Sequence, residues 1–242
     1  MKQKEVMLRA ENLRLDLGGR EIFNIDELVI HKGEVLALIG PNGAGKSSLL
    51  LTLALLQVPT DGAIRIDGEA AGNGNVLRLR RRMAVVFQDA LLLDFTVQQN
   101  IMTALRIRGV PRRDAAERMN QWLERFGIAH LARRPARVLS GGEAQRASLA
   151  RAFALEPEVL FLDEPFAALD YPTRKSLLTE LEDLLPDMSM TTLFVTHDYT
   201  EIPYLAKRVA VLYEGKILKE GSLNEVFGED ILKRSLWVPW ET

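Results

Sequence analysis

The strongest constraint on this chain is a glycine-rich segment, GPNGAGKS, at residues 40–47. It fits the pattern G-x-x-x-x-G-K-[ST], directly follows the apolar run VLALI and opens the apolar segment KSSLLLTLALLQ, which is long enough for a buried helix. In such a strand–loop–helix unit, backbone N–H groups curl around phosphates and the helix N-terminus adds a partial positive charge. A glycine-rich turn followed by a lysine is the structural alternative. Pattern and position agree, however, and we expect a nucleotide-phosphate site.

Two side chains of this segment have defined chemical roles. Lys46 can reach the β- and γ-phosphates of a nucleotide, and the Ser47 hydroxyl can bind Mg²⁺. The residues expected to hold the nucleotide are Gly40, Pro41, Asn42, Gly43, Ala44, Gly45, Lys46, Ser47 and Ser48.

A second apolar run, VLFLDEP, ends in Asp163 and Glu164. Ligands of open α/β sheets bind at the carboxyl ends of strands, so both carboxylates would lie at the nucleotide. Asp163 suits the coordination shell of Mg²⁺, while Glu164 faces the other way on the strand and can polarise an attacking water. A strand that merely ends in solvated acids is the alternative. We favour the site, because a phosphate loop precedes it.

Composition limits the class of protein. The 242 residues, 47% hydrophobic and 26% charged, suffice for one large globular domain or a domain with a subdomain. A net charge of −2 provides no positive field, so nucleic acid is not an expected partner, and the lack of cysteine excludes disulfides and thiolate metal sites. The start lacks the apolar core of a signal peptide, and the longest near-apolar run, 49–56, falls far short of about 18 residues. We expect a chain that neither crosses a membrane nor is exported.

Apolar strand-like runs separated by helical patterns predict an α/β fold. The expected strands are 7–15, 22–30, 35–39, 63–66, 84–87, 159–162 and 192–196, followed by a hairpin in RVAVLYEGKILKEG that turns on Glu214 and Gly215.

Between residues 96 and 139 the pattern becomes helical only. Thr96 and Gln99 form a possible capping box, and a helix over 112–126 would end at Gly127 and gather Ala115, Met119, Trp122 and Phe126 on one face. We interpret 91–138 as a helical subdomain inserted into a nucleotide-binding core made of 1–90 and 139–225, with a tail at 226–242, all within one domain.

The segment LSGGE predicts a helix start, with Ser140 as N-cap and Glu143 three residues later, in a helix to about residue 155. Two glycines in the first turn are poor helix formers, and their use would be to expose N–H groups to an anion. A second phosphate site is therefore indicated. The sequence does not decide whether it serves the same nucleotide.

These residues together carry a family resemblance. GPNGAGKS, Gln88 in VVFQDALLLDFTVQQNI, LSGGEAQR, VLFLDEP, AALD and His197 in FVTHD resemble the full motif set of ABC ATPases, in order and spacing, over nearly the whole chain. The resemblance implies an α/β P-loop NTPase (RecA-like) core with an N-terminal antiparallel β subdomain and an inserted α-helical subdomain. It also implies ATP hydrolysis, with ATP and Mg²⁺ as cofactors.

The same resemblance implies how the residues act together. Two copies would pack head to tail, and Ser140, Gly141, Gly142 and Glu143 of one copy would close on the ATP held by the other. His197 would contact the γ-phosphate, Gln88 would touch Mg²⁺ and the attacking water, and Asp170 would link the two sites across the homodimer. Metal contacts would come from Ser47, Gln88 and Asp163.

The implied partners are separate membrane-spanning subunits. The helical segment would receive a coupling helix from them at the cytoplasmic, inner face of the cell membrane, with an extracytoplasmic substrate-binding protein upstream. A short cassette with DEPFAALD and TVQQNI resembles importer subunits, and FNIDELVI, EIPYLA and WVPWE resemble tungstate or molybdate importers. Alternatives are an exporter subunit, a soluble cassette clamp in DNA repair or translation, and a non-hydrolysing regulator. The balanced charge opposes the clamp, and Glu164 and His197 oppose the regulator.

Four further features lie outside the motif set. Many relatives carry an adenine-stacking aromatic residue where this chain has Leu17, which implies weaker base discrimination. Pro203 would kink or shorten its helix. Arg78, Arg80, Arg81 and Arg82 are interpreted as a solvated helix face rather than a phosphate patch, and Trp237 and Trp240 are expected to pack on the core.

Overall fold

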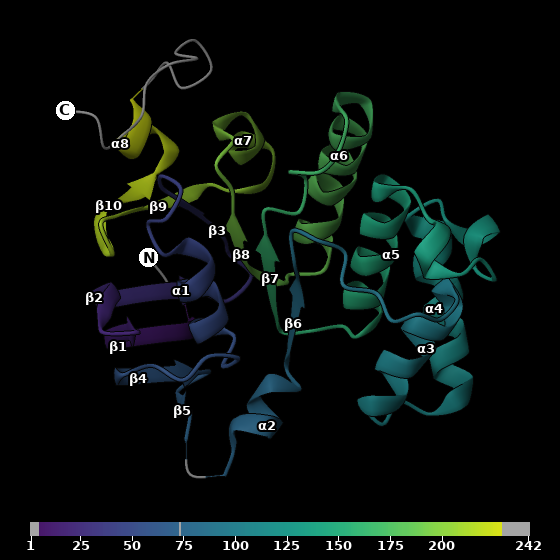
Figure 1. Cartoon of the computed structure of the whole chain (residues 1–242), viewed down its shortest axis with the longest axis horizontal. Coiled ribbons are helices and arrows are strands. Elements are labelled where there is room, and N and C mark those ends of the chain that lie inside the picture. The colour runs from purple at the N-terminus through teal and green to yellow at the C-terminus, as the bar shows by residue number, and fades with distance from the viewer. Residues whose placement is uncertain (1–4, 73, 229–242) are drawn as a thin grey trace.

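The computed structural model describes residues 5–72 and 74–228. Its centre is a six-stranded sheet in the order β10-β9-β3-β8-β7-β6, beside which lies a four-stranded sheet in the order β2-β1-β4-β5 (Figure 1). The central sheet contains β3 (Val35–Ile39), β6 (Met83–Val86), β7 (Val159–Asp163), β8 (Thr191–Val195), β9 (Arg208–Tyr213) and β10 (Lys216–Ser222). The second sheet contains β1 (Val6–Leu17), β2 (Arg20–His31), β4 (Asp61–Ile66) and β5 (Glu69–Ala70).

The two sheets differ in strand direction as the sequence predicts. Strands β6, β7, β8, β3 and β9 are parallel, and their short apolar runs are buried on both faces. β10 returns antiparallel to β9 through a turn at Glu214 and Gly215, which both have positive φ. β1 pairs antiparallel with β2 and with β4, so the fold is the expected α/β core with an antiparallel β part.

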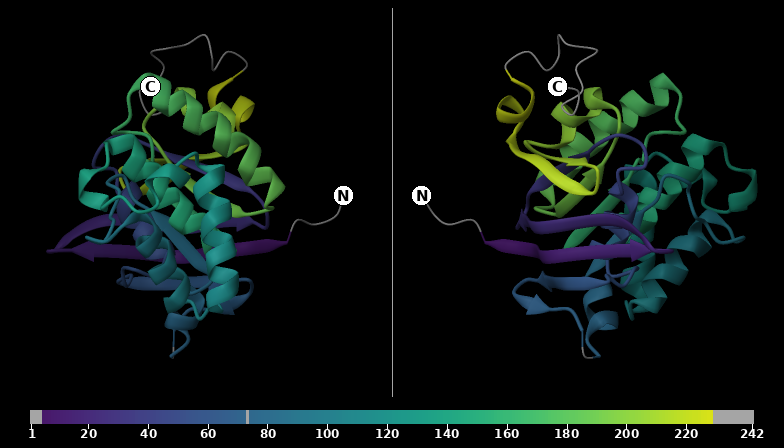
Figure 2. Two further views of the ribbon diagram at one scale, coloured as in Figure 1. Left: turned by 90° about the vertical axis from the view of Figure 1, so that its right-hand side faces the viewer. Right: turned by 60° about the vertical axis from the view of Figure 1, so that its left-hand side comes forward.

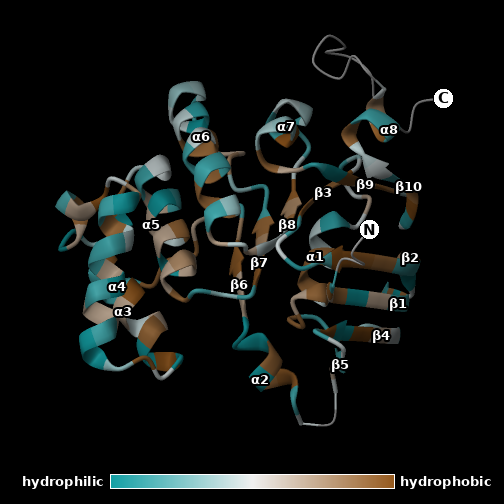
Figure 3. Cartoon of the chain, turned by 180° about the vertical axis from the view of Figure 1, so that it is seen from behind, coloured by the Kyte–Doolittle hydropathy of each residue, from teal (hydrophilic) through white to brown (hydrophobic). Residues whose placement is uncertain are grey.

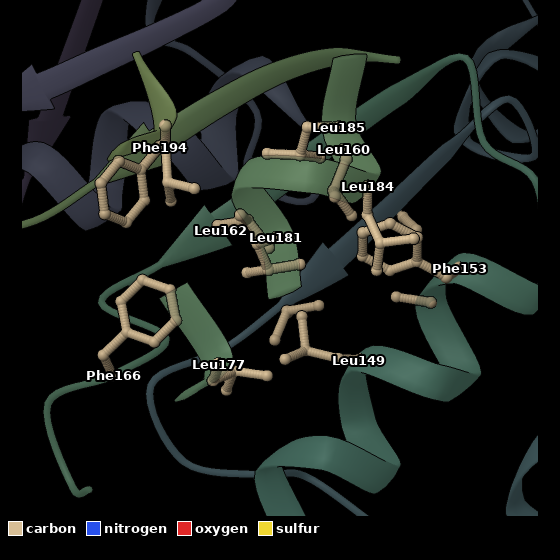
Figure 4. Close-up of a cluster of buried hydrophobic side chains, with 14 of the residues drawn as sticks. Leu149, Phe153, Leu160, Leu162, Phe166, Leu177, Leu181, Leu184, Leu185 and Phe194 are labelled. Atoms are coloured by element: carbon tan, nitrogen blue, oxygen red, sulfur yellow. The ribbon is translucent and has the colours of Figure 1, made fainter. Parts of the chain in front are cut away.

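Alternate residues of the central strands serve two hydrophobic cores. Val159 and Phe161 of β7 pack with β1, β2 and helix α1 (Lys46–Leu53) on one face. Leu160 and Leu162 pack on the other face with helices α5 (Gly141–Ala154) and α6 (Tyr171–Asp187), whose leucines appear in Figure 4. In both views of Figure 2 the green helix α6 lies above the long purple antiparallel strands β1 and β2. This period-2 division fixes which helix covers which face.

The segment between β6 and α5 is helical. It contains α3 (Val97–Ile107), α4 (Arg112–Arg125) and two short 3₁₀ turns (Ala129–Leu131 and Ala136–Val138). Thr96 caps α3 in the predicted capping box with Gln99. Trp122 and Phe126 are buried against Phe153 of α5, with ring centroids 5.1 and 5.4 Å away, which confirms the predicted apolar face of α4. Figure 3 shows the brown strands β6, β7 and β8 beside helices that carry teal residues on their outer sides.

Helix α1 ends earlier than the apolar segment suggests. Its last residue is Leu53, and Leu55 adopts a left-handed φ of 60° while Leu56 N–H donates to Leu51 O. The side chain of Leu55 stays buried, so hydrophobicity continued past the helix without helical backbone. Periodicity alone could not locate this turn.

Two minor expectations need correction. Pro203 lies in the first turn of α7 (Ile202–Leu205), where proline is tolerated, so it does not kink the helix. The alternative expectation of a shortened helix agrees with α7, which has four residues and follows a 3₁₀ turn (Tyr199–Glu201). The arginines around α2 (Val76–Arg80) are not one solvated face, because Arg82 bridges Asp67 and Glu158 and Arg80 donates to Leu55 O. The remaining short helix is α8 (Leu223–Phe227), and Trp237 and Trp240 lie outside the described residues.

Candidate functional site

Four motifs meet at one edge of the central sheet. Because β3, β6, β7 and β8 are parallel, their carboxyl ends lie at the same edge. Gly40 follows β3, Asp163 ends β7, Gln88 follows β6 after one residue, and His197 follows β8 after one residue. The topology thus brings together segments as distant in the sequence as Gly40 and His197, at the place where ligands of α/β sheets bind.

The phosphate loop requires glycine at two positions. A Cβ on Gly40 would stand 2.0 Å from Leu212 O, and one on Gly45 would stand 3.0 Å from Ile22 O, with positive φ at both. Gly45 is the N-cap of α1 and offers no side-chain cap, so the first N–H groups of the helix are available to an anion. The loop therefore has the features expected of a phosphate cradle.

Lys46 lies under this loop. Its Nζ donates to Gly40 O at 3.0 Å and to Pro41 O at 3.1 Å, and it stands 4.0 Å from Glu164 Oε1. The side chain is only 5% exposed, and burial lowers the pKa of Lys46. A desolvated ammonium at this place is a strong partner for phosphate oxygens.

The oxygens of Ser47 and Asp163 suit Mg²⁺. Ser47 Oγ donates to Asp163 Oδ1 at 3.1 Å, and Asp163 is buried at the end of β7. Burial raises the pKa of Asp163, because a desolvated carboxylate lacks sufficient positive charge nearby. Hard oxygen donors in this setting fit a magnesium ion whose other ligands come from phosphate and water. The described residues contain no group of three or more His, Asp or Glu that could hold a metal alone.

Glu164 and His197 form a direct pair. His197 Nδ1 lies 2.8 Å from Glu164 Oε2, although 33 residues separate them. Glu164 adopts a left-handed φ of 45°, and its N–H donates to Val195 O at 2.9 Å. With this backbone, one oxygen of the Glu164 carboxylate reaches His197 and the other stands near Lys46, whereas Asp163 contacts Ser47. Backbone strain of this kind in a non-glycine residue is typical of functional sites.

The predicted N-cap at Ser140 is confirmed. Ser140 Oγ accepts from Glu143 N–H and Ser140 N–H donates to Glu143 Oε2 at 2.7 Å, a bond that lowers the pKa of Glu143. α5 packs on the face of the sheet opposite α1. The structure thus does not bring Ser140, Gly141 and Gly142 onto the phosphate loop of the same chain, and Figure 1 shows the sheet between the two helices.

The remaining predicted site residues surround this centre. Gln88 is exposed and lines a cavity of about 180 Å³ with Gly141 and Leu169, apart from Ser47 and Asp163. Asp170 caps α6 by accepting from Thr173 N–H at 2.9 Å. Leu17 is 45% exposed at the end of β1, next to the β1–β2 turn.

Four residues beside the site were missed by sequence reasoning. Thr196, Asp198 and Glu201 flank His197, and Arg174 on α6 donates to Asp198 Oδ2 at 2.9 Å. Arg174 and Asp198 are 24 residues apart in the sequence, and no spacing rule links them. The available signals were the segment FVTHD, which contains Thr196 and Asp198, and a glutamate amid apolar residues in TEIPYL.

The parallel sheet, the phosphate loop and the Lys46–Glu164–His197 centre define a P-loop nucleotide-binding protein. Residues 23–167 match the ABC transporter family. The chain belongs to this family, and the expectation of an ATPase of this class is confirmed.

Three curated relatives resemble this chain to a similar degree. A probable sulfate/thiosulfate import ATP-binding protein CysA of Chlorella vulgaris is 39% identical, covering 89% of this chain and 91% of its own. The corresponding protein of Thermosynechococcus vestitus is 40% identical (91% and 65%), and a molybdate/tungstate import ATP-binding protein WtpC of Thermococcus kodakarensis is 39% identical (82% and 60%). The chain thus spans less than two thirds of the length of these last two relatives.

Solved structures show the same fold. CbiO1 from Clostridium perfringens, part of the ABC transporter complex CbiONQ, has a TM-score of 0.85 at 29% identity, covering 95% of this chain and 93% of its own. A dimeric ATP-binding cassette in a post-hydrolysis state, bound to ADP and Pi, has a TM-score of 0.81 at 27% identity (90% and 99%). Within the described ranges, no helix of this chain is both long and apolar enough to span a membrane.

Proposed function

We propose that this chain hydrolyses ATP as the cassette subunit of an importer, working as a head-to-tail dimer beneath separate membrane subunits. The observation that carries the catalytic part is the contact of Lys46, Glu164 and His197 at the phosphate loop. These groups meet at the edge where Ser47 and Asp163 offer oxygens to Mg²⁺. Phosphoryl transfer needs mainly positioning and charge stabilisation, and this set supplies both.

The roles follow from the chemistry of each group. The loop amides and Lys46 would hold the β- and γ-phosphates, and Mg²⁺, held by Ser47 and through water by Asp163, would neutralise the charge that develops on them. Glu164 would orient the attacking water, and His197, hydrogen-bonded to it, would keep the carboxylate in place beside the γ-phosphate. Gln88 would join the metal and water only when its loop approaches, since it lies exposed here.

The dimer is proposed from the placement of the second phosphate site. The first turn of α5 exposes Ser140 and Gly141, and it lies across the sheet from the phosphate loop of its own chain. A second copy arranged head to tail would supply this turn to each nucleotide. The dimeric state of the similar ADP-bound cassette supports the arrangement.

The membrane subunits would dock on α3. Two adjoining cavities, which share Thr103, lie along this helix, with volumes of about 610 and 420 Å³. We call them the α3 groove. They are lined by exposed apolar side chains such as Phe95 and Ile107, and the groove is large enough for a short helix of a partner at the inner face of the cell membrane.

The substrate is proposed as a tetrahedral oxyanion. The relatives named above are importers of sulfate or thiosulfate in two cases and of molybdate or tungstate in one. We therefore favour sulfate or thiosulfate as the transported anion over tungstate or molybdate, which the sequence alone suggested. An extracytoplasmic binding protein would deliver the anion. Uptake of labelled sulfate and of molybdate in cells that lack this chain tests the order, and unchanged uptake of both would refute the oxyanion assignment.

The catalytic part is tested with Glu164→Gln. We expect turnover of ATP to fall at least a hundredfold, while a stable dimer forms on size exclusion with ATP and Mg²⁺. Glu182→Gln, the same change at an exposed glutamate of α6 outside the predicted site residues, is the control and keeps wild-type turnover. A Glu164→Gln protein that remains active and monomeric contradicts both the catalytic role and the closure of the dimer.

A further inference from the structure

The loop that carries His197 is fixed on both sides by side-chain hydrogen bonds. Before it, Thr196 Oγ1 donates to Glu201 Oε2 at 2.6 Å and accepts from Asp198 N–H at 3.0 Å. After it, Asp198 Oδ1 accepts from Thr200 N–H at 2.9 Å. Thr196 and Glu201 are 2% and 3% exposed. These bonds order the backbone on either side of His197, whereas the histidine side chain is 53% exposed.

A single arginine joins this loop to another element. Arg174 Nη1 donates to Asp198 Oδ2 at 2.9 Å, and Arg174 Nε stands 3.9 Å from Glu201 Oε1. Arg174 lies in the first turn of α6, one turn after its N-cap Asp170. The segment 164–174 thus contacts the His197 loop twice, at its start through Glu164 and at its end through Arg174.

Arg174 is not needed to hold α6 in place. Leu177, Leu181 and Leu184 of α6 are buried against β7 and α5, as Figure 4 shows, and they anchor the helix from its second turn onwards. The ion pair of Arg174 is partly solvent-exposed, at 28% for both partners, and pairs of this kind add little to stability. The hydrogen bond of Arg174 joins two segments that carry catalytic residues. This geometry suggests a role other than stabilising the fold.

We propose that Arg174 is a positioning residue that keeps the His197 ring on Glu164 by holding Asp198. Segment 165–170, which leads from Glu164 to Asp170, lies between the two contacts, so a displacement of this segment changes the position of Arg174 and of the histidine loop together. The effect on catalysis rests on the proposed function, but the contacts of Arg174 and His197 lie within one chain.

The experiment compares Arg174→Gln with Arg118→Gln. Arg118 is a matched control because it makes a bridge of the same kind to Glu156, at 3.0 Å and with 31% exposure, away from the site. The chain has three histidines, so ring ¹⁵N resonances can be followed for His197, with His31 and His130 as internal references. We expect Arg174→Gln to move the His197 resonances alone and to lower kcat about tenfold or more, with KM within twofold of wild type. Arg174→Lys should restore part of kcat.

Unchanged His197 resonances in Arg174→Gln overturn the proposal, as does a loss that appears in KM only. If Arg174→Gln does not fold, Asp198→Asn removes the same charge pair from the other side and is judged by the same resonances. The resonances are measured without nucleotide. A wild-type chain without ATPase activity would therefore refute the proposed function, while the response of His197 would still decide the positioning role.

Discussion

At the scale of single residues, the site is a set of charges that burial makes interdependent. Lys46 and Asp163 are both desolvated, and their pKa values move towards the neutral form of each group. Each is stabilised by contacts within the loop or with Ser47, and a nucleotide with Mg²⁺ would supply the missing opposite charges. Nucleotide binding should therefore stabilise the fold as well as occupy the site.

Glu201 makes stability depend on pH. Burial raises the pKa of Glu201 from 4.5 to about 7, against the opposing effects of Thr196 and Arg174 and with the help of Asp198. Between these pH values the unfolded chain releases the proton and the folded chain keeps it, so the free energy of unfolding falls as pH rises. The total is about 3 kcal/mol, lost between pH 4.5 and 7.

Glu201→Gln should remove this dependence. Urea unfolding at pH 5 and pH 8 is expected to show the variant gaining about 2–3 kcal/mol relative to wild type on going to the higher pH. Glu182→Gln, which removes an exposed carboxyl of α6, controls for the change in net charge. Equal differences from wild type at both pH values would show that Glu201 is not held neutral by burial.

Leu17 bears on the choice of base. An aliphatic side chain in place of an aromatic one loses base stacking, worth about 1 kcal/mol. Leu17→Tyr is therefore expected to raise the preference for ATP over GTP roughly fivefold, measured as kcat/KM for both nucleotides. A wild-type protein and a variant that use ATP and GTP equally would count against a role of residue 17 in base discrimination.

The contiguous parts of the site were predictable from sequence and the dispersed parts were not. The phosphate loop, Asp163, Glu164 and the Ser140 cap each lie in one short segment, where local rules apply. The contact of Glu164 with His197 required the strand order of the sheet, and the approach of Arg174 to Asp198 required the packing of α6. Such contacts depend on tertiary structure, which a local pattern does not contain.

At the scale of elements, the first turn of α5 combines two opposing demands. Its capping box stabilises a helix start, but Gly141 and Gly142 weaken the same turn. The two glycines differ in the space around them. A Cβ on Gly142 would stand 2.9 Å from Thr173 Cγ2 of α6, whereas one on Gly141 would meet only Ala168 O at 3.8 Å. A methyl group on Gly142 would therefore crowd the Thr173 methyl, which would have to rotate away, whereas one on Gly141 meets no close atom.

The two alanine variants should therefore separate stability from function. Gly141→Ala is expected to keep or raise the free energy of unfolding, by up to about 1 kcal/mol, and to lose ATPase activity because the methyl group occupies the space of a phosphate. Gly142→Ala should be less stable than Gly141→Ala by about 0.5–1.5 kcal/mol, because Thr173 has to leave its rotamer. Thermal unfolding and turnover measured on both variants decide this, and full activity of Gly141→Ala would contradict a phosphate site at this turn.

Elements also show where periodicity stops being informative. The helix face of α4 and the β9–β10 hairpin were predicted correctly, because amphipathic spacing and turn residues mark them. The end of α1 was placed too late, since Leu55 and Leu56 continue the apolar run after the backbone has turned. An apolar residue that is buried just after a helix looks the same in the sequence as one inside the helix, so the sequence does not mark where the helix ends.

At the scale of the whole molecule, the nucleotide edge and the α3 groove are joined through the central sheet and α5. α5 contacts both α3 and α4, and Gln145 near its start donates to Phe87 O at 3.3 Å, one residue before Gln88. A partner seated in the groove would thus press on the same helix that presents Ser140 and on the loop that carries Gln88. This continuity supports a mechanical link between the membrane subunits and the second phosphate site.

Ile107→Glu tests the groove without touching the nucleotide site. Ile107 is 65% exposed and lines the smaller cavity, so a charge there should prevent docking of an apolar helix and release the chain from membranes that contain its partners. Leu218→Glu places the same charge on β10, at a leucine that is 54% exposed and outside the groove, and should leave sedimentation with membranes unchanged. ATPase activity and the ATP-dependent dimer are expected to persist in both variants, because neither residue lines the phosphate loop. Equal retention of both variants on membranes would place the docking surface elsewhere, whereas loss of activity in Ile107→Glu alone would mean that the groove residue acts on the nucleotide site within one chain.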